Sequence, residues 1–238
     1  MQAERPILCY VTDSSTLQGG VAALPGVMRA ALRAGVDWIQ IREKDLPARQ
    51  LVELTRVAVQ EARAMVASAG VSGTPPLQRR VRILVNDRLD VALAAGANGV
   101  HLGGSSLPVA KVVDWLSKRG PSGGIAGGSE DPPLQLLVGR SCHSLSEAQQ
   151  AERDGASYII FGPVYATPSK EHYGAPQKVE RLREVCGAVR IPVLAIGGIT
   201  AENARVCLQA GAAGIAAIRM FQATADVAAV VRSLRDAR

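Results

Sequence analysis

The most constraining feature of this sequence is a pattern that occurs four times along the chain. In each copy a glycine ends a helix-like segment, and a short apolar run soon follows. A glycine at the end of a helix readily takes the left-handed conformation that stops the helix. A helix stop followed by a buried strand, repeated at even spacing, is typical of a fold built from β-strand and α-helix units. The copies begin at Ala34-Gly35, Ala95-Gly96, Asp154-Gly155 and Ala210-Gly211.

Between and around these copies the sequence contains eight short apolar segments, each followed by a segment with helical character. Short unbroken apolar strands are typical of a parallel sheet that is covered on both faces. The predicted strands are 7–12, 36–41, 81–86, 98–102, 136–140, 157–162, 191–196 and 213–218. The predicted helices are 21–34, 47–69, 88–95, 108–118, 144–153, 178–187, 200–210 and 223–236.

Eight such units in 238 residues predict an α/β protein, a single-domain TIM (β/α)8 barrel that spans residues 1–238 as one catalytic domain. An open, doubly wound sheet is the alternative, but the G-x-G-x-x-G pattern typical of that fold is missing after the first predicted strand. Two segments rich in glycine and proline, 70–80 and 119–133, precede the third and fifth strands. We expect them at the N-terminal ends of the strands, with mobility rather than chemistry.

Charge and cysteine content argue against several classes of protein. The net charge is +6, but the basic residues are scattered, so we expect no nucleic-acid binding, and phosphorylated small substrates explain part of the excess. The four cysteines lack C-x-x-C spacing, which predicts reduced, inert thiols and no zinc site. A signal-peptide pattern and an apolar run of membrane-spanning length are both missing. These features predict a cytoplasmic protein that binds no membrane.

The second predicted strand ends abruptly in charged residues. Gln40, Arg42 and Lys44 share one parity, so in an extended segment their side chains would point to the same side. Arginine offers a planar fork of donors and lysine a point charge, and the two together suit a phosphate. The stretch therefore indicates an anion site. A solvated strand end with surface ion pairs is the alternative interpretation.

Residues after other strands should join this site, because the active site of a TIM barrel lies at the C-terminal ends of its strands. Lys170 and the hydroxyls of Ser141, Thr167 and Ser169 would add charge and donors for a pyrophosphate. His101, at the end of the fourth strand, is interpreted as a hydrogen-bonded packing residue.

Two further strand ends suggest a metal and a second phosphate. Asn86 and Asp87 offer the hard oxygen ligands that Mg²⁺ uses alongside phosphate oxygens. Gly197 and Gly198, at the start of a helix, and Ile218, at the end of the eighth strand, match the recurrent phosphate site of TIM barrels. Two facing phosphate sites imply two phosphorylated substrates, and a pyrophosphate with a metal implies a leaving group.

The strand ends carry six motifs: Gln40-Ile41-Arg42-Glu43-Lys44, Asn86-Asp87-Arg88, Gly99-Val100-His101-Leu102-Gly103, Ser141-Cys142-His143-Ser144, Gly162-Pro163-Val164-Tyr165-Ala166-Thr167-Pro168-Ser169-Lys170 and Ile196-Gly197-Gly198-Ile199. In type and order they resemble the motifs of the thiamine phosphate synthase family and of its sister group, the TenI thiazole tautomerases. The resemblance spans nearly the whole chain.

The resemblance implies a transferase that joins a hydroxymethylpyrimidine pyrophosphate to a hydroxyethylthiazole phosphate and releases pyrophosphate. It implies that Asp87 binds Mg²⁺ and that the pyrophosphate leaves first, or nearly so, before the thiazole nitrogen captures the pyrimidine-methyl cation. By the same resemblance the pyrimidine pyrophosphate contacts Gln40, Arg42, Lys44, Asn86, Ser141 and Lys170. The thiazole phosphate contacts Thr167, Pro168, Ser169, Gly198, Ile218 and Arg219.

The sequence departs from the synthase pattern at two positions. Ser106 stands where the synthases have an aspartate that is the second metal ligand, and Arg219 stands where a serine is common. A hydroxyl is a poorer ligand for Mg²⁺ than a carboxylate. We expect Arg219 to strengthen binding of the thiazole phosphate.

The loss of that aspartate leaves two other functions open. One is a metal-independent thiazole tautomerase with His143 as acid and base, although His143 is also consistent with a role at the start of a helix. The other is a non-catalytic barrel that binds phosphate ligands. Retention of Lys44, Asp87, Ser169 and Lys170 favours the synthase, because a tautomerase handles no pyrophosphate. A homodimer is also compatible with a barrel of this type.

Overall fold

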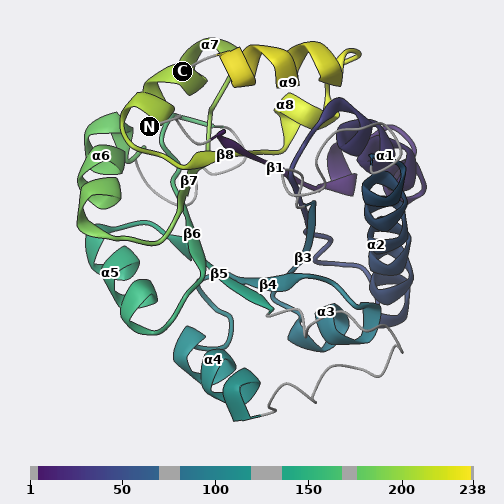
Figure 1. The fold of residues 1–238 in the computed structure, drawn as a ribbon, viewed down its shortest axis with the longest axis horizontal. Helices are drawn as coiled ribbons and strands as arrows, with labels where there is room; N and C mark the ends of the chain where they lie inside the picture. The colour runs from purple at the N-terminus through teal and green to yellow at the C-terminus, as the bar shows by residue number, and fades with distance from the viewer. Residues whose placement is uncertain (1–4, 70–80, 119–135, 168–175, 237–238) are drawn as a thin grey trace.

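The computed structural model describes residues 5–69, 81–118, 136–167 and 176–236. Eight parallel strands close into a barrel in chain order, from β1 beside β2 round to β8 beside β1. Figure 1 shows the strands as an inner ring with the helices around it. The predicted TIM barrel is confirmed. The strands are β1 (Ile7–Val11), β2 (Trp38–Ile41), β3 (Arg82–Asn86), β4 (Gly99–Leu102), β5 (Leu137–Cys142), β6 (Tyr158–Phe161), β7 (Val193–Ala195) and β8 (Gly214–Ala217).

The helices follow the predicted order, with additions at both ends of the chain. Two 3-10 turns, η1 (Ser14–Thr16) and η2 (Gly20–Ala23), precede the first helix. The helix predicted at 223–236 begins at Val227, because the Asp226 side chain accepts a hydrogen bond from the Ala229 amide at 2.8 Å. The α-helices are α1 (Leu24–Ala34), α2 (Ala48–Ala69), α3 (Leu89–Ala95), α4 (Val109–Lys118), α5 (Leu145–Arg153), α6 (Lys178–Ala188), α7 (Ala201–Gln209), α8 (Arg219–Gln222) and α9 (Val227–Asp236).

The glycines of the four-fold repeat end helices as predicted. Gly35, Gly96, Gly155 and Gly211 have φ angles of 107°, 67°, 89° and 101°, all in the left-handed region that favours glycine. Each glycine reverses the chain after a helix so that the next strand can enter the barrel.

The barrel interior is filled by packed side chains. Its inward-facing cluster contains Cys9, Val11, Leu84, Tyr158, Ile160, Leu194 and Ala216. The Trp38 ring packs edge-on against the Tyr158 ring, with centroids 4.8 Å apart. Tyr158 fits because Gly139 on the neighbouring strand has no side chain, and a Cβ there would lie 2.1 Å from the tyrosine ring. Ligands therefore have to bind at an end of the barrel.

An ion pair at the N-terminal ends of the strands joins distant parts of the chain. The Arg235 guanidinium of α9 lies 2.5 Å from the Asp37 carboxylate, just before β2, and donates to the Gly35 carbonyl at 3.0 Å. Only 15% and 18% of the two side chains are exposed. The Asp37 carboxylate also accepts from the Leu8 amide of β1 at 2.9 Å. The pair thus joins the last helix to the first two strands.

The four cysteines form no disulfide with one another, and three of them, Cys9, Cys142 and Cys207, are buried. The prediction of free, buried thiols is confirmed for these three, whereas Cys186 is half-buried. Within the described ranges, every helix is too short or too polar to cross a membrane. The segments 70–80 and 119–133, for which we predicted mobility, lie outside the described residues.

Candidate active site

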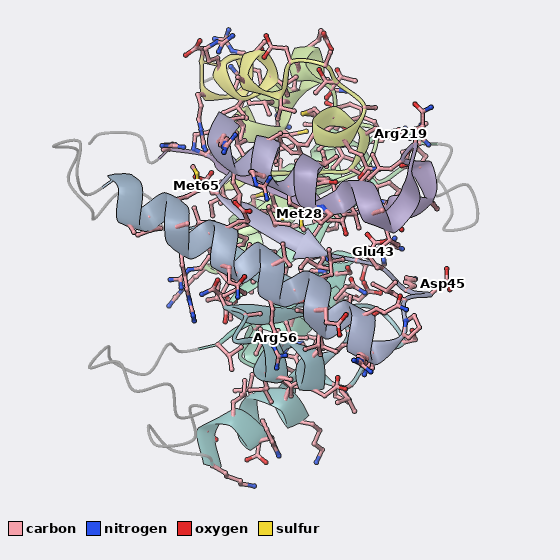
Figure 2. All side chains as sticks on the ribbon, turned by 90° about the vertical axis from the view of Figure 1, so that its right-hand side faces the viewer. Met28, Glu43, Asp45, Arg56, Met65 and Arg219 are labelled. Atoms are coloured by element: carbon pink, nitrogen blue, oxygen red, sulfur yellow. The ribbon has the colours of Figure 1, made fainter. Side chains whose placement is uncertain are left out.

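The C-terminal ends of the strands form one end of the molecule. In Figure 2, Glu43 and Asp45, which follow β2, lie toward the same end as Arg219, which follows β8. Met65, late in α2, lies toward the opposite end. The strand ends therefore bring together segments far apart in the sequence, and we call this end the mouth of the barrel.

A chain of hydrogen bonds joins the ends of the neighbouring strands β2 and β3 at one side of the mouth. The Gln40 amide nitrogen donates to the Asn86 side-chain oxygen at 2.8 Å, and the Asn86 amide nitrogen donates to the Asp87 carboxylate at 2.5 Å. Gln40 is only 2% exposed, yet its oxygen Oε1 is buried with no hydrogen-bond partner among the described residues. A buried acceptor without a donor is unfavourable unless something fills the role. This oxygen is thus suited to accept from a bound ligand.

Asp87 and Ser106 lie in direct contact. The Asp87 oxygen Oδ1 accepts from the Gly103 amide at 2.9 Å and from the Ser106 hydroxyl. Asp87 has a φ of 61°, a left-handed conformation that few residues other than glycine adopt. Such outliers cluster at functional sites, where the surrounding structure holds them. The Ser106 hydroxyl, which also accepts from the Gly103 amide at 2.7 Å, thus lies directly beside the Asp87 carboxylate.

The donor set around Asp87 fits a hard cation with few protein ligands. Among the described residues, three or more His, Cys, Asp or Glu side chains nowhere gather in a metal-binding group. Mg²⁺ does not need such a group, since it usually keeps several waters and takes one or two carboxylates plus phosphate oxygens. The Asp87 carboxylate and the Ser106 hydroxyl could together supply two oxygen ligands.

Ser141 of β5 is held from inside the barrel. The His101 nitrogen Nε2 lies 2.8 Å from the Ser141 hydroxyl, and its Nδ1 lies 3.1 Å from the Tyr158 hydroxyl. His101 is 1% exposed, so the role of a hydrogen-bonded packing residue predicted for it is confirmed. Burial, more than the nearby Cys9, raises the pKa of Tyr158 well above its ordinary value, so the phenol stays neutral. This buried network fixes the orientation of the Ser141 hydroxyl.

His143 lies between the ends of β5 and β6. Its ring nitrogen Nδ1 is 2.5 Å from the Gly162 carbonyl oxygen. A carbonyl can only accept, so this nitrogen carries a proton. The backbone amide of His143 donates to the Glu147 carboxylate at 2.6 Å, while Glu147 donates its own amide to Ser144 at 3.2 Å. The start of α5 thus holds the backbone of His143, and the segment after β6 holds its ring.

Arg42 and Lys44 lie beyond the end of β2, which stops at Ile41. The strand alternation that we used to align them with Gln40 therefore does not extend to them. Arg42 is half-buried, whereas Lys44 is exposed and lies in a turn. Both residues stay at the mouth, but their direction is set by this turn and not by the strand.

Gly197 and Gly198 lie in a tight turn after β7, with φ angles of 97° and 61°. A Cβ at Gly197 would lie 2.5 Å from the Pro163 side chain, and one at Gly198 would lie 2.5 Å from the Ala166 carbonyl oxygen. The glycines therefore allow this turn to pack closely against the segment after β6. The helix α7 begins at Ala201, one residue from the predicted start at 200, so the two glycines lie just before it.

The remaining predicted contacts of the thiazole phosphate follow β6 and β8. Thr167 is half-buried and is the last described residue of its segment, while Pro168, Ser169 and Lys170 lie outside the described residues. Ile218 is the N-cap residue of α8 and packs against the inner cluster. Arg219 is exposed at the mouth (Figure 2). The structure thus brings Ile218 and Arg219 to the same end as Gln40 and Asp87.

The sequence did not indicate the role of Glu43. This carboxylate is only 8% exposed, and it accepts hydrogen bonds from Thr12 and Ser14 in the segment after β1. Because Glu43 lies inside a run of charged residues, it looked like a surface group. Its partners are about thirty residues away in the chain, and no local pattern predicts such a pairing.

The fold and the mouth together define a TIM-barrel enzyme, with amide, hydroxyl and carboxylate groups gathered at the strand ends. The family model described as thiamine monophosphate synthase matches residues 8–120 and 132–221. The chain therefore belongs to the thiamine monophosphate synthase family.

Individual relatives agree with the family match. The thiamine-phosphate synthase of Moorella thermoacetica is 39% identical over 227 residues, which cover 95% of this chain and 93% of the relative. That of Roseiflexus castenholzii is 37% identical over 232 residues, covering 98% and 88%. A solved thiamine phosphate pyrophosphorylase from Pyrococcus furiosus superposes with a TM-score of 0.76 at 30% identity, covering 97% of this chain and 94% of that one. The predicted family and the predicted function, a thiamine phosphate synthase of the transferase class, are confirmed.

Proposed function

We propose that the mouth of this barrel joins hydroxymethylpyrimidine pyrophosphate to hydroxyethylthiazole phosphate. The bond between the pyrimidine methylene carbon and the pyrophosphate oxygen breaks, and its electron pair leaves on pyrophosphate. The thiazole nitrogen then supplies the pair for the new C–N bond. No proton has to be transferred, so the site has chiefly to stabilise the charge that develops on the leaving group. The absence of a strong base from the predicted set agrees with this demand.

The observation that carries the proposal is the hydrogen-bonded chain from Gln40 through Asn86 and Asp87 to Ser106. It orients an amide, a carboxylate and a hydroxyl at one side of the mouth. The unpaired oxygen of Gln40 would accept from a donor on the pyrimidine. Such preorganised dipoles are worth more in a half-buried site than in water, because they need no reorganisation during the reaction.

The remaining groups of this side are assigned to the pyrophosphate. Arg42, Lys44 and Lys170 would neutralise its charge, and the hydroxyl of Ser141, held by His101, would donate to it. Mg²⁺ would bind at Asp87, with the Ser106 hydroxyl as a second protein oxygen. When bound, the ion would neutralise charge on the pyrophosphate oxygens.

The thiazole phosphate would bind on the other side of the mouth. Backbone amides at Gly197 and Gly198 can approach an anion closely, because these residues carry no side chain. Thr167, Pro168, Ser169, Ile218 and Arg219 complete the proposed set. Arg219 would add a charge that the usual serine lacks, and an unchanged affinity for the thiazole phosphate in Arg219→Ala would contradict this role.

The proposal is tested by pyrophosphate release from both substrates, with and without Mg²⁺. We expect metal-dependent release coupled to formation of thiamine phosphate. Asp87→Ala should reduce kcat by about a hundredfold or more, because it removes an electrostatic group at the leaving group. Ser106→Asp should lower the Mg²⁺ concentration needed for half-maximal rate by about tenfold, because it adds a hard charged ligand beside Asp87.

Other outcomes would point to the alternative functions. Release without Mg²⁺ that is unaffected by Asp87→Ala would refute the metal assignment. No release under any condition would refute the proposed reaction. Thiazole isomerisation lost in His143→Ala would then indicate the tautomerase, and binding of phosphate ligands without turnover would indicate a non-catalytic barrel.

Two broader assignments belong to the same proposal. We place the enzyme in the cytoplasm, in keeping with four cysteines that form no disulfide with one another, and we propose that it forms a homodimer. Its partners would be the two phosphorylated substrates, and neither nucleic acid nor membrane. Sedimentation of the purified protein tests the dimer.

A further inference from the structure

A buried carboxylate lies within the cation-bearing turn of the mouth. Glu43 stands between Arg42 and Lys44 and is 8% exposed. A buried charge is unfavourable unless hydrogen bonds compensate it. Here both oxygens are used, since Oε1 accepts from the Thr12 hydroxyl at 2.5 Å and Oε2 accepts from the Ser14 amide at 3.1 Å and its hydroxyl at 2.5 Å. The carboxylate is thus turned onto the segment after β1, away from any anion bound by its neighbours.

Thr12 connects this carboxylate to the backbone of Arg42. Its single hydroxyl donates to Glu43 and accepts from the Arg42 backbone amide at 2.9 Å. The Thr12 amide also donates to the Gln40 carbonyl at 2.9 Å, and Thr12 is fully buried. Thr12 therefore binds the backbone at Gln40 and at Arg42, on either side of Ile41 at the end of β2.

The segment after β1 is itself anchored from the other side by Gln222 of α8. The Gln222 amide nitrogen donates to the Asp13 carbonyl at 2.7 Å and to the Thr16 hydroxyl at 2.5 Å. Its oxygen accepts from the Tyr10 hydroxyl at 2.8 Å. The segment after β1 is therefore bound by Glu43 on one side and by Gln222 on the other. Its position does not depend on the turn that carries Glu43.

We infer that Glu43 is a positioning residue, which acts through Thr12 to fix the backbone at Arg42 and thereby aims the cations of this turn at the pyrophosphate. The inference rests on the proposed function, because it assigns the pyrophosphate to these cations. Glu43 itself does not touch the substrate. Its effect should appear in the binding of one substrate and not of the other.

Steady-state kinetics of Thr12→Val, with each substrate varied in turn, tests this inference. Valine has nearly the shape of threonine but leaves the Arg42 amide and the Glu43 carboxylate without their shared partner. We expect the KM for the pyrimidine pyrophosphate to rise by about tenfold or more, the loss typical of a buried hydrogen bond left unmade. The KM for the thiazole phosphate should stay within about twofold. Thr12→Ser, which keeps the hydroxyl, should restore the wild-type values.

Thr55→Val is the matched control. Thr55 is also fully buried, and its hydroxyl donates at 2.7 Å to the Leu51 carbonyl within α2, away from this relay. The same chemical change there should alter thermal stability without changing either KM. Should Thr12→Val not fold, Glu43→Met applies the same test, since methionine has a similar length and removes both acceptor oxygens.

The outcomes separate positioning from a merely structural role. If Thr12→Val lowers the Tm but leaves the KM for the pyrimidine pyrophosphate unchanged, or if Thr55→Val raises that KM equally, the inference is wrong. If the wild-type enzyme releases pyrophosphate but Thr12→Val keeps the wild-type KM for the pyrimidine pyrophosphate, only this inference is overturned. A wild-type enzyme without pyrophosphate release would overturn the proposed function as well.

Discussion

Replacing Gly139 with alanine should destabilise the barrel from the inside. An added Cβ would lie 2.1 Å from Cζ and 2.4 Å from the hydroxyl oxygen of Tyr158. Ordinary contact between carbon atoms needs about 3.5 Å, so the ring has to move by about 1.4 Å. It has little room, because Tyr158 is fully buried and its ring packs edge-on against Trp38.

The cost can be worked from these contacts. Forcing one extra methyl group into a packed core typically destabilises a protein by about 1–3 kcal/mol. Displacing Tyr158 would also weaken its 3.1 Å contact with His101, which adds about 1 kcal/mol. The free energy of unfolding should therefore fall by about 2–4 kcal/mol, equivalent to a drop in Tm of roughly 5–15 °C for a chain of this size.

Gly26→Ala supplies the control. Gly26 lies exposed in α1, and nothing lies within 4 Å of the Cβ it would gain. Alanine should stabilise this helix by about 0.5–1 kcal/mol, so the same substitution should act in opposite directions at the two sites. Urea and thermal unfolding of both variants would measure this. A Gly139→Ala protein as stable as the wild type would refute the argument that Tyr158 requires a glycine beneath it.

Two further predictions concern the Arg235–Asp37 ion pair at the N-terminal ends of the strands and the buried thiols. Arg235→Ala should lower the free energy of unfolding by about 1–3 kcal/mol, because it removes a charged donor from the half-buried Asp37. Arg181→Ala, which breaks an exposed ion pair, should change the free energy of unfolding by less than about 0.5 kcal/mol. Equal losses for the two variants in urea titrations would contradict this. Burial raises the pKa of Cys142 to about 12 and that of Cys186 to about 11. Since the thiolate is the reactive form, these thiols should react slowly with a disulfide reagent at pH 8 and faster as the pH rises. They should react fully only in denaturant. Rapid reaction of either thiol in the folded protein at pH 8 would contradict this prediction.

The repeat of helix, glycine and apolar strand was enough to predict the barrel. All eight strands fall within the predicted segments or within two residues of them, because a parallel strand covered on both faces is apolar throughout. The short helix α8 was missed because four residues cannot show a helical period. The capping box of α7, in which Thr200 and Asn203 bond each other's backbone, was also missed because its third residue is asparagine and not glutamate.

The candidate site was predicted as a set of strand ends but not as a network. Gln40, Asn86 and Asp87 lie at the C-terminal ends of the second and third strands, and this alone places them at the mouth. Their mutual hydrogen bonds depend on the stagger of neighbouring strands, which hydrophobic pattern does not specify. The contact between Asp87 and Ser106 and the burial of Glu43 are likewise properties of three-dimensional packing.

Because the inner cluster, with Trp38 packed against it, fills the barrel, a site at the strand ends is reached from the mouth and not through the barrel. Both substrates have to enter, and both products have to leave, over the same rim. If the cations of the mouth bind the pyrophosphate as we propose, the released product would compete with the next pyrimidine substrate for them. The release of pyrophosphate through the mouth, rather than the bond-making step alone, would then limit the turnover rate where pyrophosphate is abundant.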